Sequence, residues 1–330
     1  FWGIQFGFKV GSFEMAHSLK HWINDGLMAV FFFVIGLEVK RELVLGELRE
    51  PRKALLPIAA AVGGMLVPAA ISLTLQWGEP GVRGWGIPMA TDIAFAIGAL
   101  VLLASRVPKA LITFLVALAI VDDLGAVIVI ALFYTEQIDW TMLAIAAVLL
   151  GLLVSFNFGG IRRPLPYFLI GILLWLALLK SGVHATLAGV LTALTIPAKP
   201  KYDPDLFSQR VKELIGRFDK SYRPGMSIMN NEEQRAIVQT LENGVKLVET
   251  PLQRLEHSMH LPVAFLVIPI FAFFNAGIPL EMGALGETLS HPVTLGVMLG
   301  LVLGKFIGIA GVSWLALKLG VGQLPAGTSM

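Results

Sequence analysis

The stretch from Ala110 to Tyr134, ALITFLVALAIVDDLGAVIVIALFY, decides the fold of this chain. It is long enough to cross a bilayer as one helix, because such a helix needs about 20 apolar residues. Its only charged residues are two adjacent aspartates near the middle, Asp122 and Asp123. A carboxylate at the centre of a membrane helix costs about 2.5–3.5 kcal/mol on insertion scales. So large a cost indicates a function, with a polar pair buried for packing as the alternative.

Adjacency gives the two aspartates different surroundings. Neighbouring positions on a helix point about 100° apart, so the two side chains face different partners. Two carboxylates this close do not easily ionise together. A carboxylate that holds either a proton or a cation is the minimal part of a proton-coupled transporter. We therefore expect Asp122 and Asp123 to bind a cation and protons in competition.

The composition is that of a protein that crosses a membrane several times. The chain has 330 residues, of which 56% are hydrophobic and 15% charged, and this excludes an ordinary soluble domain. It contains no cysteine, so disulfides, thiol catalysis and thiolate metal sites are excluded. A net charge of +2 is too small to indicate a nucleic-acid partner. The predicted fold class is therefore an all-α polytopic membrane protein.

Apolar runs of about 20 residues predict the membrane spans. The nine candidates lie near residues 22–39, 54–76, 86–104, 110–134, 141–157, 164–179, 183–197, 261–279 and 293–317. This divides the chain into seven spans within residues 1–197, a polar helical loop at residues 198–258 and two spans within residues 259–330. We assign the loop no role in transport.

Lysine and arginine predict which loops are cytoplasmic, because cytoplasmic loops retain these residues. The connections on one side of the predicted spans carry ten basic residues and those on the other side carry four. This places the first residue of the chain outside and the loop at 198–258 in the cytoplasm. The odd number of spans and the turn-like ending GQLPAGTSM suggest a fragment or a naturally shortened chain.

Lys305 is the one basic residue well inside a predicted span. Its depth in the span 293–317 matches that of the aspartate pair. A lysine buried in a membrane needs a carboxylate partner or must deprotonate, so Asp122 or Asp123 is its natural partner. The sequence leaves open whether this pair is a structural salt bridge or exchanges protons during transport.

The predicted span at 86–104 contains Thr91 and Asp92, and we expect it to be interrupted. Pro88 lacks an amide donor and disfavours helix before it. A broken helix at membrane depth is tolerated where it lines a cavity enclosed by protein. Hydroxyl and carboxylate oxygens suit alkali cations, so Thr91 and Asp92 join the aspartate pair in a predicted oxygen site. The alternative is that Asp92 only caps an ordinary helix.

Acids and histidines gather at the predicted cytoplasmic ends of two spans. Several are spaced three or four residues apart and share a helix face, and histidine titrates near neutral pH. The group is therefore a candidate pH sensor, with plain solvation at the interface as the alternative. Its members are Glu38, Arg41, Glu42, Glu256, His257 and His260. We expect His184, at the outer start of its span, to be packed or hydrogen-bonded.

Six runs in collinear order resemble the bacterial NhaA-type sodium/proton antiporters. The runs are WINDGLMAVFFFVIGLEVKREL, IPMATDIAFAIGAL, VALAIVDDLGAVIVIALFYT, LKSGVHATLAGV, PLQRLEH and PIFAFFNAGI. The resemblance implies exchange of cytoplasmic sodium or lithium for external protons across the bacterial inner membrane, with no enzymatic activity and no cofactor. It also implies an inverted-repeat antiporter fold with interrupted helices.

The resemblance assigns roles to the matching residues. Asp123 is the principal sodium ligand, and Asp122 is its neighbour, salt-bridged to Lys305 in at least one state. Thr91 and Asp92 lie at the unwound segment of an interrupted helix. The acids and histidines at the cytoplasmic ends match the family's pH-sensing funnel, and His184 matches a further position linked to the pH response.

The chain also departs from the family pattern. We expect it to lack the family's first helix and last two helices, with the crossing partner of the span 86–104 among the last two. The fold is therefore expected to be incomplete at both ends. Expected partners are membrane lipid, sodium and protons, with a homodimer left open and no nucleic acid.

Four alternatives to sodium/proton antiport share parts of this chemistry. Another cation/proton-coupled transporter or a cation channel would use the same oxygen site. A retinal-type photoprotein also has a mid-membrane lysine near aspartates. An intramembrane aspartyl protease needs two acids from different helices, and Asp92 with Asp123 would supply them.

Overall fold

The structure is a computed structural model, and it describes residues 4–10, 13–90, 108–135, 138–199, 204–224, 227–277, 283 and 285–324. Within these ranges, seven helices are long and apolar enough to cross a membrane. Five of them are single α-helices: α1 (Leu19–Leu45), α2 (Pro51–Leu75), α4 (Lys109–Phe133), α5 (Trp140–Phe158) and α6 (Pro164–Ser181). The prediction of an all-α polytopic membrane protein is confirmed.

The other two long helices each contain a π-helical segment. The first runs through α10 (Pro251–Pro262), η5 (Val263–Val267) and α11 (Ile268–Asn275). The second runs through α13 (Pro292–Leu299), η7 (Gly300–Gly304) and α14 (Lys305–Lys318). A π-helical turn inserts an extra residue into the backbone ladder, and such turns are frequent at functional sites. The apolar pattern alone does not reveal them.

The predicted spans at 183–197 and 86–104 depart most from the structure. The run at 183–197 contains only the nine-residue helix α7 (Leu187–Thr195), because Gly182 takes a positive φ of 81° and turns precede the helix. At about 1.5 Å per residue, nine residues do not cross the apolar core. The start of the run at 86–104 belongs to the 3₁₀-helix η2 (Pro80–Met89). Residues 91–107 lie outside the described residues.

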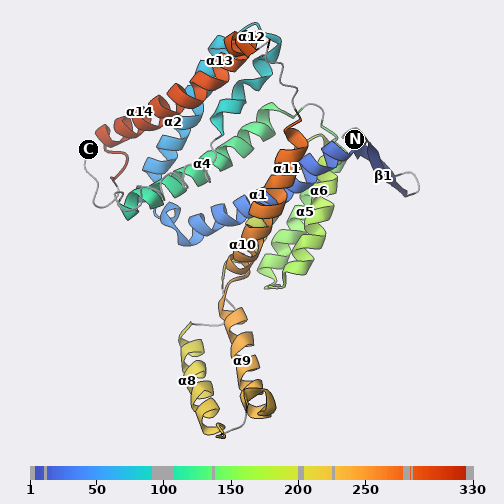
Figure 1. Ribbon diagram of the computed structural model, residues 1–330, viewed down its shortest axis with the longest axis vertical. Helices are drawn as coiled ribbons and strands as arrows, with labels where there is room; N and C mark the ends of the chain where they lie inside the picture. The colour runs from blue at the N-terminus through green and yellow to red at the C-terminus, as the bar shows by residue number, and fades with distance from the viewer. Residues whose placement is uncertain are drawn as a thin grey trace.

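The membrane helices form two packed groups (Figure 1). In one group α14 and α13 lie along α2, which also packs against α4 and η2. In the other, α1 packs against α7 and α10, and α5 packs against α6. The connection between the groups includes contacts of α1 with α4 and with η1 (Glu47–Arg49). The short helix α12 (Leu285–Ser290) precedes α13.

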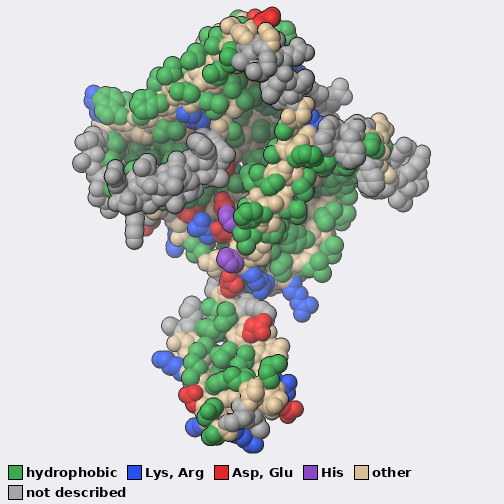
Figure 2. Space-filling view, viewed as in Figure 1, with side chains coloured by type: hydrophobic (Ala, Val, Ile, Leu, Met, Phe, Trp, Pro, Cys, Tyr) green, Lys and Arg blue, Asp and Glu red, His purple; other side chains and the backbone are tan. Residues whose placement is uncertain are grey.

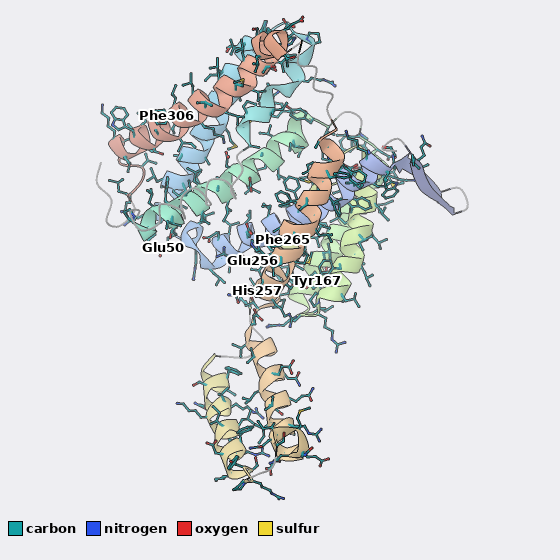
Figure 3. All side chains as sticks on the ribbon, viewed as in Figure 1. Glu50, Tyr167, Glu256, His257, Phe265 and Phe306 are labelled. Atoms are coloured by element: carbon teal, nitrogen blue, oxygen red, sulfur yellow. The ribbon has the colours of Figure 1, made fainter. Side chains whose placement is uncertain are left out.

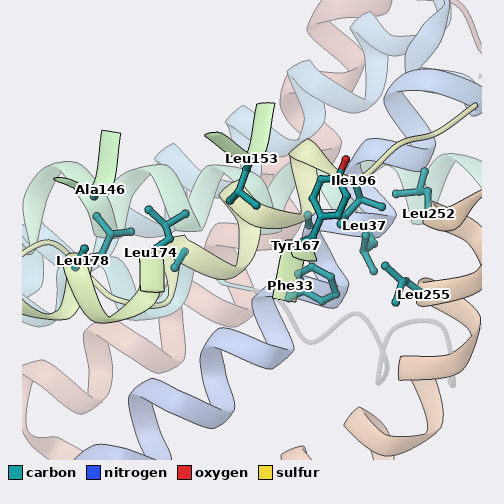
Figure 4. Close-up of a cluster of buried hydrophobic side chains, with 13 residues drawn as sticks. Phe33, Leu37, Ala146, Leu153, Tyr167, Leu174, Leu178, Ile196, Leu252 and Leu255 are labelled. Carbon is teal, nitrogen blue, oxygen red and sulfur yellow. The ribbon is translucent and has the colours of Figure 1, made fainter. Parts of the chain in front are cut away.

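The largest buried apolar cluster belongs to the second group (Figure 4). Leu37, Leu153 and Leu252 are fully buried there and come from α1, α5 and α10. Tyr167 joins them from α6, and its hydroxyl donates to the carbonyl of Ile161 at 3.0 Å. The cluster joins α1 to four other helices, α5, α6, α7 and α10. Helix α1 in turn carries Glu38 and Glu42, two acids of the candidate pH sensor.

A β-hairpin precedes α1 in the sequence. Strands β1 (Gln5–Val10) and β2 (Phe13–Ser18) pair antiparallel, with Gln5 opposite Ser18 and Val10 opposite Phe13. Ser18 then caps α1, because its side chain accepts a hydrogen bond from the amide of His21. The apolar runs of the sequence predict helices alone, so the hairpin is a finding of the structure.

A helical hairpin extends from the membrane helices within the predicted polar loop (Figure 2). It consists of α8 (Pro204–Lys220), η4 (Ile228–Asn230) and α9 (Glu232–Val248). Figure 2 shows apolar side chains over most of the helical body, while charged side chains gather on the hairpin and where it joins the body. A continuous apolar surface fits a bilayer, and a mixed charged surface fits water. The location of this helical hairpin on the cytoplasmic side remains a prediction.

Candidate ion-binding site

Asp122 is almost completely buried in the middle of α4, with 1% of its side chain exposed. Lys305, the first residue of α14, places its Nζ 2.7 Å from Asp122 Oδ2. The lysine side chain is itself only 11% exposed. A pair of opposite charges at this depth avoids the cost of either charge buried alone. The structure thus selects Asp122 from the two acids that the sequence offered as the lysine's partner.

Lys305 has a second acceptor, the backbone carbonyl of Met89. Met89 is the last residue of η2 and is buried. One ammonium group therefore joins α4, α14 and the end of η2. The residue that follows the lysine, Phe306, is exposed and points outward from α14 (Figure 3).

Close packing of α14 on α2 brings Lys305 to this place. A Cβ added at Gly308 would overlap the carbonyl of Gly63, and one added at Gly304 would lie 2.7 Å from the Cα of Pro68. Small residues let two membrane helices approach to backbone contact. The aliphatic chain of Lys305 passes Gly64, where an added Cβ would be 3.8 Å from its Cδ. These glycines explain why a lysine on α14 reaches α4 past α2.

Asp123 follows Asp122 on α4 and is partly buried. Its position on the helix is about 100° from that of Asp122, so it presents its carboxylate to a different side. Thr91 and Asp92, the other two predicted oxygen ligands, lie outside the described residues. Within the described part of the chain, the site therefore consists of Asp122, Lys305 and the Met89 carbonyl, with Asp123 adjacent.

A second charged cluster lies where α1 meets α10. Arg41 Nε is 2.9 Å from Glu256 Oε1, and Arg41 Nη1 is 3.1 Å from Glu42 Oε1. Glu38 interacts electrostatically with Glu256, Arg41 and His260. The structure thus brings together acids and bases that are more than 200 residues apart in the sequence. Figure 3 shows Glu256 and the neighbouring His257 on α10, close to the start of the helical hairpin.

The three histidines of the predicted sensor occupy different surroundings. His257 and His260 are exposed on α10. His184 lies in the turn before α7, where its carbonyl accepts a hydrogen bond from the amide of Leu187 at 3.1 Å. It therefore belongs to the start of α7 rather than to the α1–α10 cluster.

Sequence reasoning missed two contacts made by lysines with backbone carbonyls. One is the Lys305–Met89 bond. The other joins Lys40 on α1 to the carbonyls of Leu194 and Ile196 at the end of α7. The last carbonyls of a helix have no partner within it, and a cation there is favourable. A backbone acceptor leaves no residue-specific signal, so neither contact is visible before the helices are packed.

Comparison with known proteins identifies the family. The profile of the family described as Na+/H+ antiporter 1 matches residues 1–330. An Na(+)/H(+) antiporter NhaA 1 from Saccharophagus degradans is 58% identical over 327 residues, which cover 99% of this chain and 70% of that protein. An Na(+)/H(+) antiporter NhaA from Sulfurimonas denitrificans is 53% identical over 321 residues, covering 97% of this chain and 72% of that protein.

These comparisons confirm the resemblance inferred from the six sequence runs. The profile match extends through the whole chain. The expectation that the family's first and last two helices are missing is not borne out. The family consists of transporters, and with seven apolar helices in the described residues the chain is a multi-pass protein of the bacterial inner membrane. The photoprotein, protease and channel alternatives are set aside. The chain belongs to the Na+/H+ antiporter 1 family of sodium/proton antiporters.

Proposed function

We propose that this chain exchanges sodium or lithium for protons by competition at Asp122 and Asp123. The observation that carries the proposal is the buried ion pair, at 2.7 Å, between Asp122 in the middle of α4 and Lys305 at the start of α14. A function that needs charge in the membrane accounts for its cost. Family membership identifies the exchanged ions as sodium and protons.

The charges of the site give the competition a physical basis. When both aspartates are ionised, two carboxylates and one ammonium leave one net negative charge. That charge attracts a sodium ion, for which carboxylate and carbonyl oxygens are suitable ligands. Addition of a proton removes the net charge and with it the attraction. Because the site holds either a proton or a cation, exchange follows once protonation releases sodium on the opposite side.

Lys305 gives the two aspartates different roles. It neutralises Asp122 across 2.7 Å, so Asp123 is proposed as the principal sodium ligand. Thr91 and Asp92 are proposed as further oxygen ligands on the strength of the resemblance. The contact of Lys305 with the Met89 carbonyl ties this arrangement to the chain segment just before Thr91.

Regulation by pH is assigned to the α1–α10 cluster. Arg41 on α1 donates to Glu256 on α10 and to Glu42 on its own helix. His257 and His260 lie further along α10. Histidine is the side chain type whose charge changes near neutral pH, and His260 on α10 interacts electrostatically with Glu38 on α1, so we assign the pH response to this contact between the two helices. His184 is proposed as a separate contributor at the start of α7.

The proposed orientation follows from the basic residues. The larger set of lysines and arginines places residues 198–258 in the cytoplasm and the first residue on the periplasmic side. The α8–α9 hairpin then projects into the cytoplasm. The resemblance also leaves a homodimer open. Measurement of the mass of the protein in detergent tests for it.

Proton movement in everted vesicles tests the function. Addition of sodium to vesicles that contain the parent chain is expected to release accumulated protons, and Asp123→Asn is expected to abolish the release. Asp139→Asn is the matched control, since Asp139 caps α5 by accepting from the amides of Thr141 and Met142, a role that asparagine also fills. Full activity of Asp123→Asn would refute the assignment.

A further inference from the structure

Lys40 of α1 binds the end of α7 with its ammonium group. Lys40 Nζ donates to the carbonyl oxygen of Leu194 at 2.6 Å, and it also donates to the carbonyl of Ile196. The last carbonyls of an α-helix have no partner within the helix, and a positive charge at that end is favourable. One lysine therefore satisfies two carbonyls at the point where α7 ends.

Close packing of α1 on α7 places Lys40 beside this end. Gly36 precedes Lys40 by one turn, so both residues lie on the same face of α1. A Cβ added at Gly36 would be 2.7 Å from the Cβ of Ala193 and 3.0 Å from the Cα of Val190. Such contact between backbones is typical of small residues at helix interfaces. The next turn of α1 then brings the lysine to the last carbonyls of α7.

The segment that leaves α7 is bound to the first turn of α10. The amide of Leu252 donates to the carbonyl of Pro197 at 3.2 Å, although the whole α8–α9 hairpin separates the two residues in the sequence. Ile196 and Leu252 are 1% and 0% exposed, and they belong to the same buried cluster as Leu37 (Figure 4). The end of α7 and the start of α10 therefore meet in a buried junction at the base of the hairpin.

The first turn of α10 also positions Glu256. Leu252 and Glu256 are four residues apart and share a face of α10, and Glu256 Oε1 accepts from Arg41 Nε at 2.9 Å. Arg41 directly follows Lys40 on α1. Two consecutive cations of α1 thus hold the two segments that flank the α8–α9 hairpin. Lys40 binds the end of α7, and Arg41 binds α10.

The two cations differ in the chemistry of their partners. Arg41 binds carboxylates, which titrate, whereas Lys40 binds backbone carbonyls, which do not. Protonation of the acids therefore leaves the partners of Lys40 in place. Helix α7 carries no charged residue within Leu187–Thr195. The charged and titratable residues around Arg41 come from the other elements packed here: Glu38 and Glu42 of α1, Arg49 of η1, and Arg254, Glu256, His257 and His260 of α10.

We propose that Lys40 is a positioning residue for the α1–α10 cluster. By holding the end of α7 it fixes Pro197, whose carbonyl receives the Leu252 amide. That contact in turn fixes the first turn of α10, where Glu256 faces Arg41. The proposal rests on the proposed pH regulation at this cluster, and it assigns Lys40 no contact with the transported ions.

The pH profile of sodium-dependent proton release in everted vesicles tests the proposal. Lys40→Met keeps the aliphatic chain but lacks the ammonium group, so Arg41 opposes Glu256 less closely. A carboxyl group that loses a nearby cation favours its protonated form. The pH of half-maximal release is therefore expected to rise by at least about 0.5 unit, which is about a threefold change in proton affinity. A midpoint that stays or falls overturns the proposal.

Matched variants separate positioning from plain stabilisation of the fold. Lys40→Arg keeps the charge and the donors and is expected to stay near the parent midpoint. Lys53→Met is the control, since Lys53 lies in the first turn of α2 and pairs with Glu50 at 3.1 Å. It is expected to leave the midpoint unchanged. A lower maximal rate in Lys40→Met with an unmoved midpoint marks a merely structural role and overturns the proposal.

A double variant tests whether Lys40 acts through Glu256. If it does, Lys40→Met with Glu256→Gln is expected to have the same midpoint as Glu256→Gln alone, because residues that act through one contact are not additive. Two shifts that simply add would show that Lys40 acts on the pH profile by another route, and would overturn the proposal.

Hydrogen exchange separates a failure of this proposal from a failure of the proposed function. The Leu252 amide has its acceptor on another segment, the Pro197 carbonyl, so its exchange rate reports opening of the junction. At constant pH in detergent, Leu252 is expected to exchange faster in Lys40→Met than in the parent and in Lys40→Arg. An unchanged rate overturns the role of Lys40. A parent chain without sodium-dependent proton release at any pH contradicts the proposed function instead, and leaves this result standing.

Discussion

The Asp122–Lys305 pair and the Arg41–Glu256 pair have nearly the same geometry, at 2.7 and 2.9 Å, but different burial. The side chains of the first pair are 1% and 11% exposed, and those of the second, Arg41 and Glu256, are 34% and 20% exposed. In low dielectric a charge without its partner is very costly, whereas water and salt weaken the second pair. The buried pair thus suits a site with discrete loaded states, and the half-exposed pair suits gradual adjustment by pH.

Removal of the buried lysine is expected to have the largest effect. Lys305→Met leaves Asp122 buried without its cation, and the free energy of unfolding is expected to fall by about 3–5 kcal/mol. The double variant Lys305→Met with Asp122→Asn is expected to recover most of the loss, because no buried charge is then uncompensated. Unfolding in detergent measures both. A single variant as stable as the parent would show that the pair is not buried in this way.

Disruption of the close contact between α2 and α14, which positions Lys305, is expected to have the second largest effect on stability. Gly308→Ala places a methyl group against the Gly63 carbonyl, and such overpacking costs about 1–3 kcal/mol. Gly311→Ala on the same helix is the control, because an added Cβ there meets no atom within 4 Å. Thermal unfolding of the two variants compares them directly. Equal stability would contradict the close contact between α2 and α14.

The half-exposed pair is expected to contribute less. Glu256→Gln removes the charge opposite Arg41 and is expected to lower the free energy of unfolding by about 1 kcal/mol or less, a difference that shrinks in about 1 M salt. Glu232→Gln is the control, since Glu232 is 93% exposed and 4.0 Å from Arg235. A loss for Glu256→Gln as large as that for Lys305→Met would erase the distinction between the two clusters.

The smallest expected effect comes from a histidine outside the membrane spans. Burial, and then the stacked ring of His21 at 4.3 Å, lower the pKa of His17 below its usual value of 6.5. The folded chain therefore takes up this proton less readily than the unfolded chain. The stability associated with neutral His17 is full above pH 6.5 and declines as the pH falls through 6.5 toward the folded pKa.

Melting temperatures at about pH 7.5 and about pH 5.5 measure this decline. His17→Gln is expected to show a slightly smaller loss on acidification than the parent, because glutamine does not titrate. A larger loss in the variant would reverse the sign assigned to His17. The effect is small because the nearby carboxylate of Asp25 raises the same pKa and so opposes the lowering.

Apolar length and isolated charges predicted much of this molecule. The run at 110–134 forms α4, as predicted. The lone basic residue Lys305 pairs with an aspartate, as predicted, because a charge buried in a membrane is costly without an opposite charge. The length of helix α7 was overestimated. The apolar run does not reveal the turn at Gly182, after which only part of the run is helical. The contact of Lys305 with the Met89 carbonyl and the two π-helical segments depend on how the helices pack. No residue type in the sequence predicts them. The ligand roles of Thr91, Asp92 and Asp123 stay predictions.

The central claim is that sodium and protons compete for the aspartate pair, and proton release on sodium binding tests it most directly. Sodium is added to the purified chain in weakly buffered detergent solution, and the change in pH is recorded. The parent is expected to release protons, and its apparent affinity for sodium is expected to fall as the pH is lowered, because linkage between two ligands is reciprocal. Sodium binding without proton release, or release unchanged in the double variant Asp122→Asn with Asp123→Asn, would contradict the account.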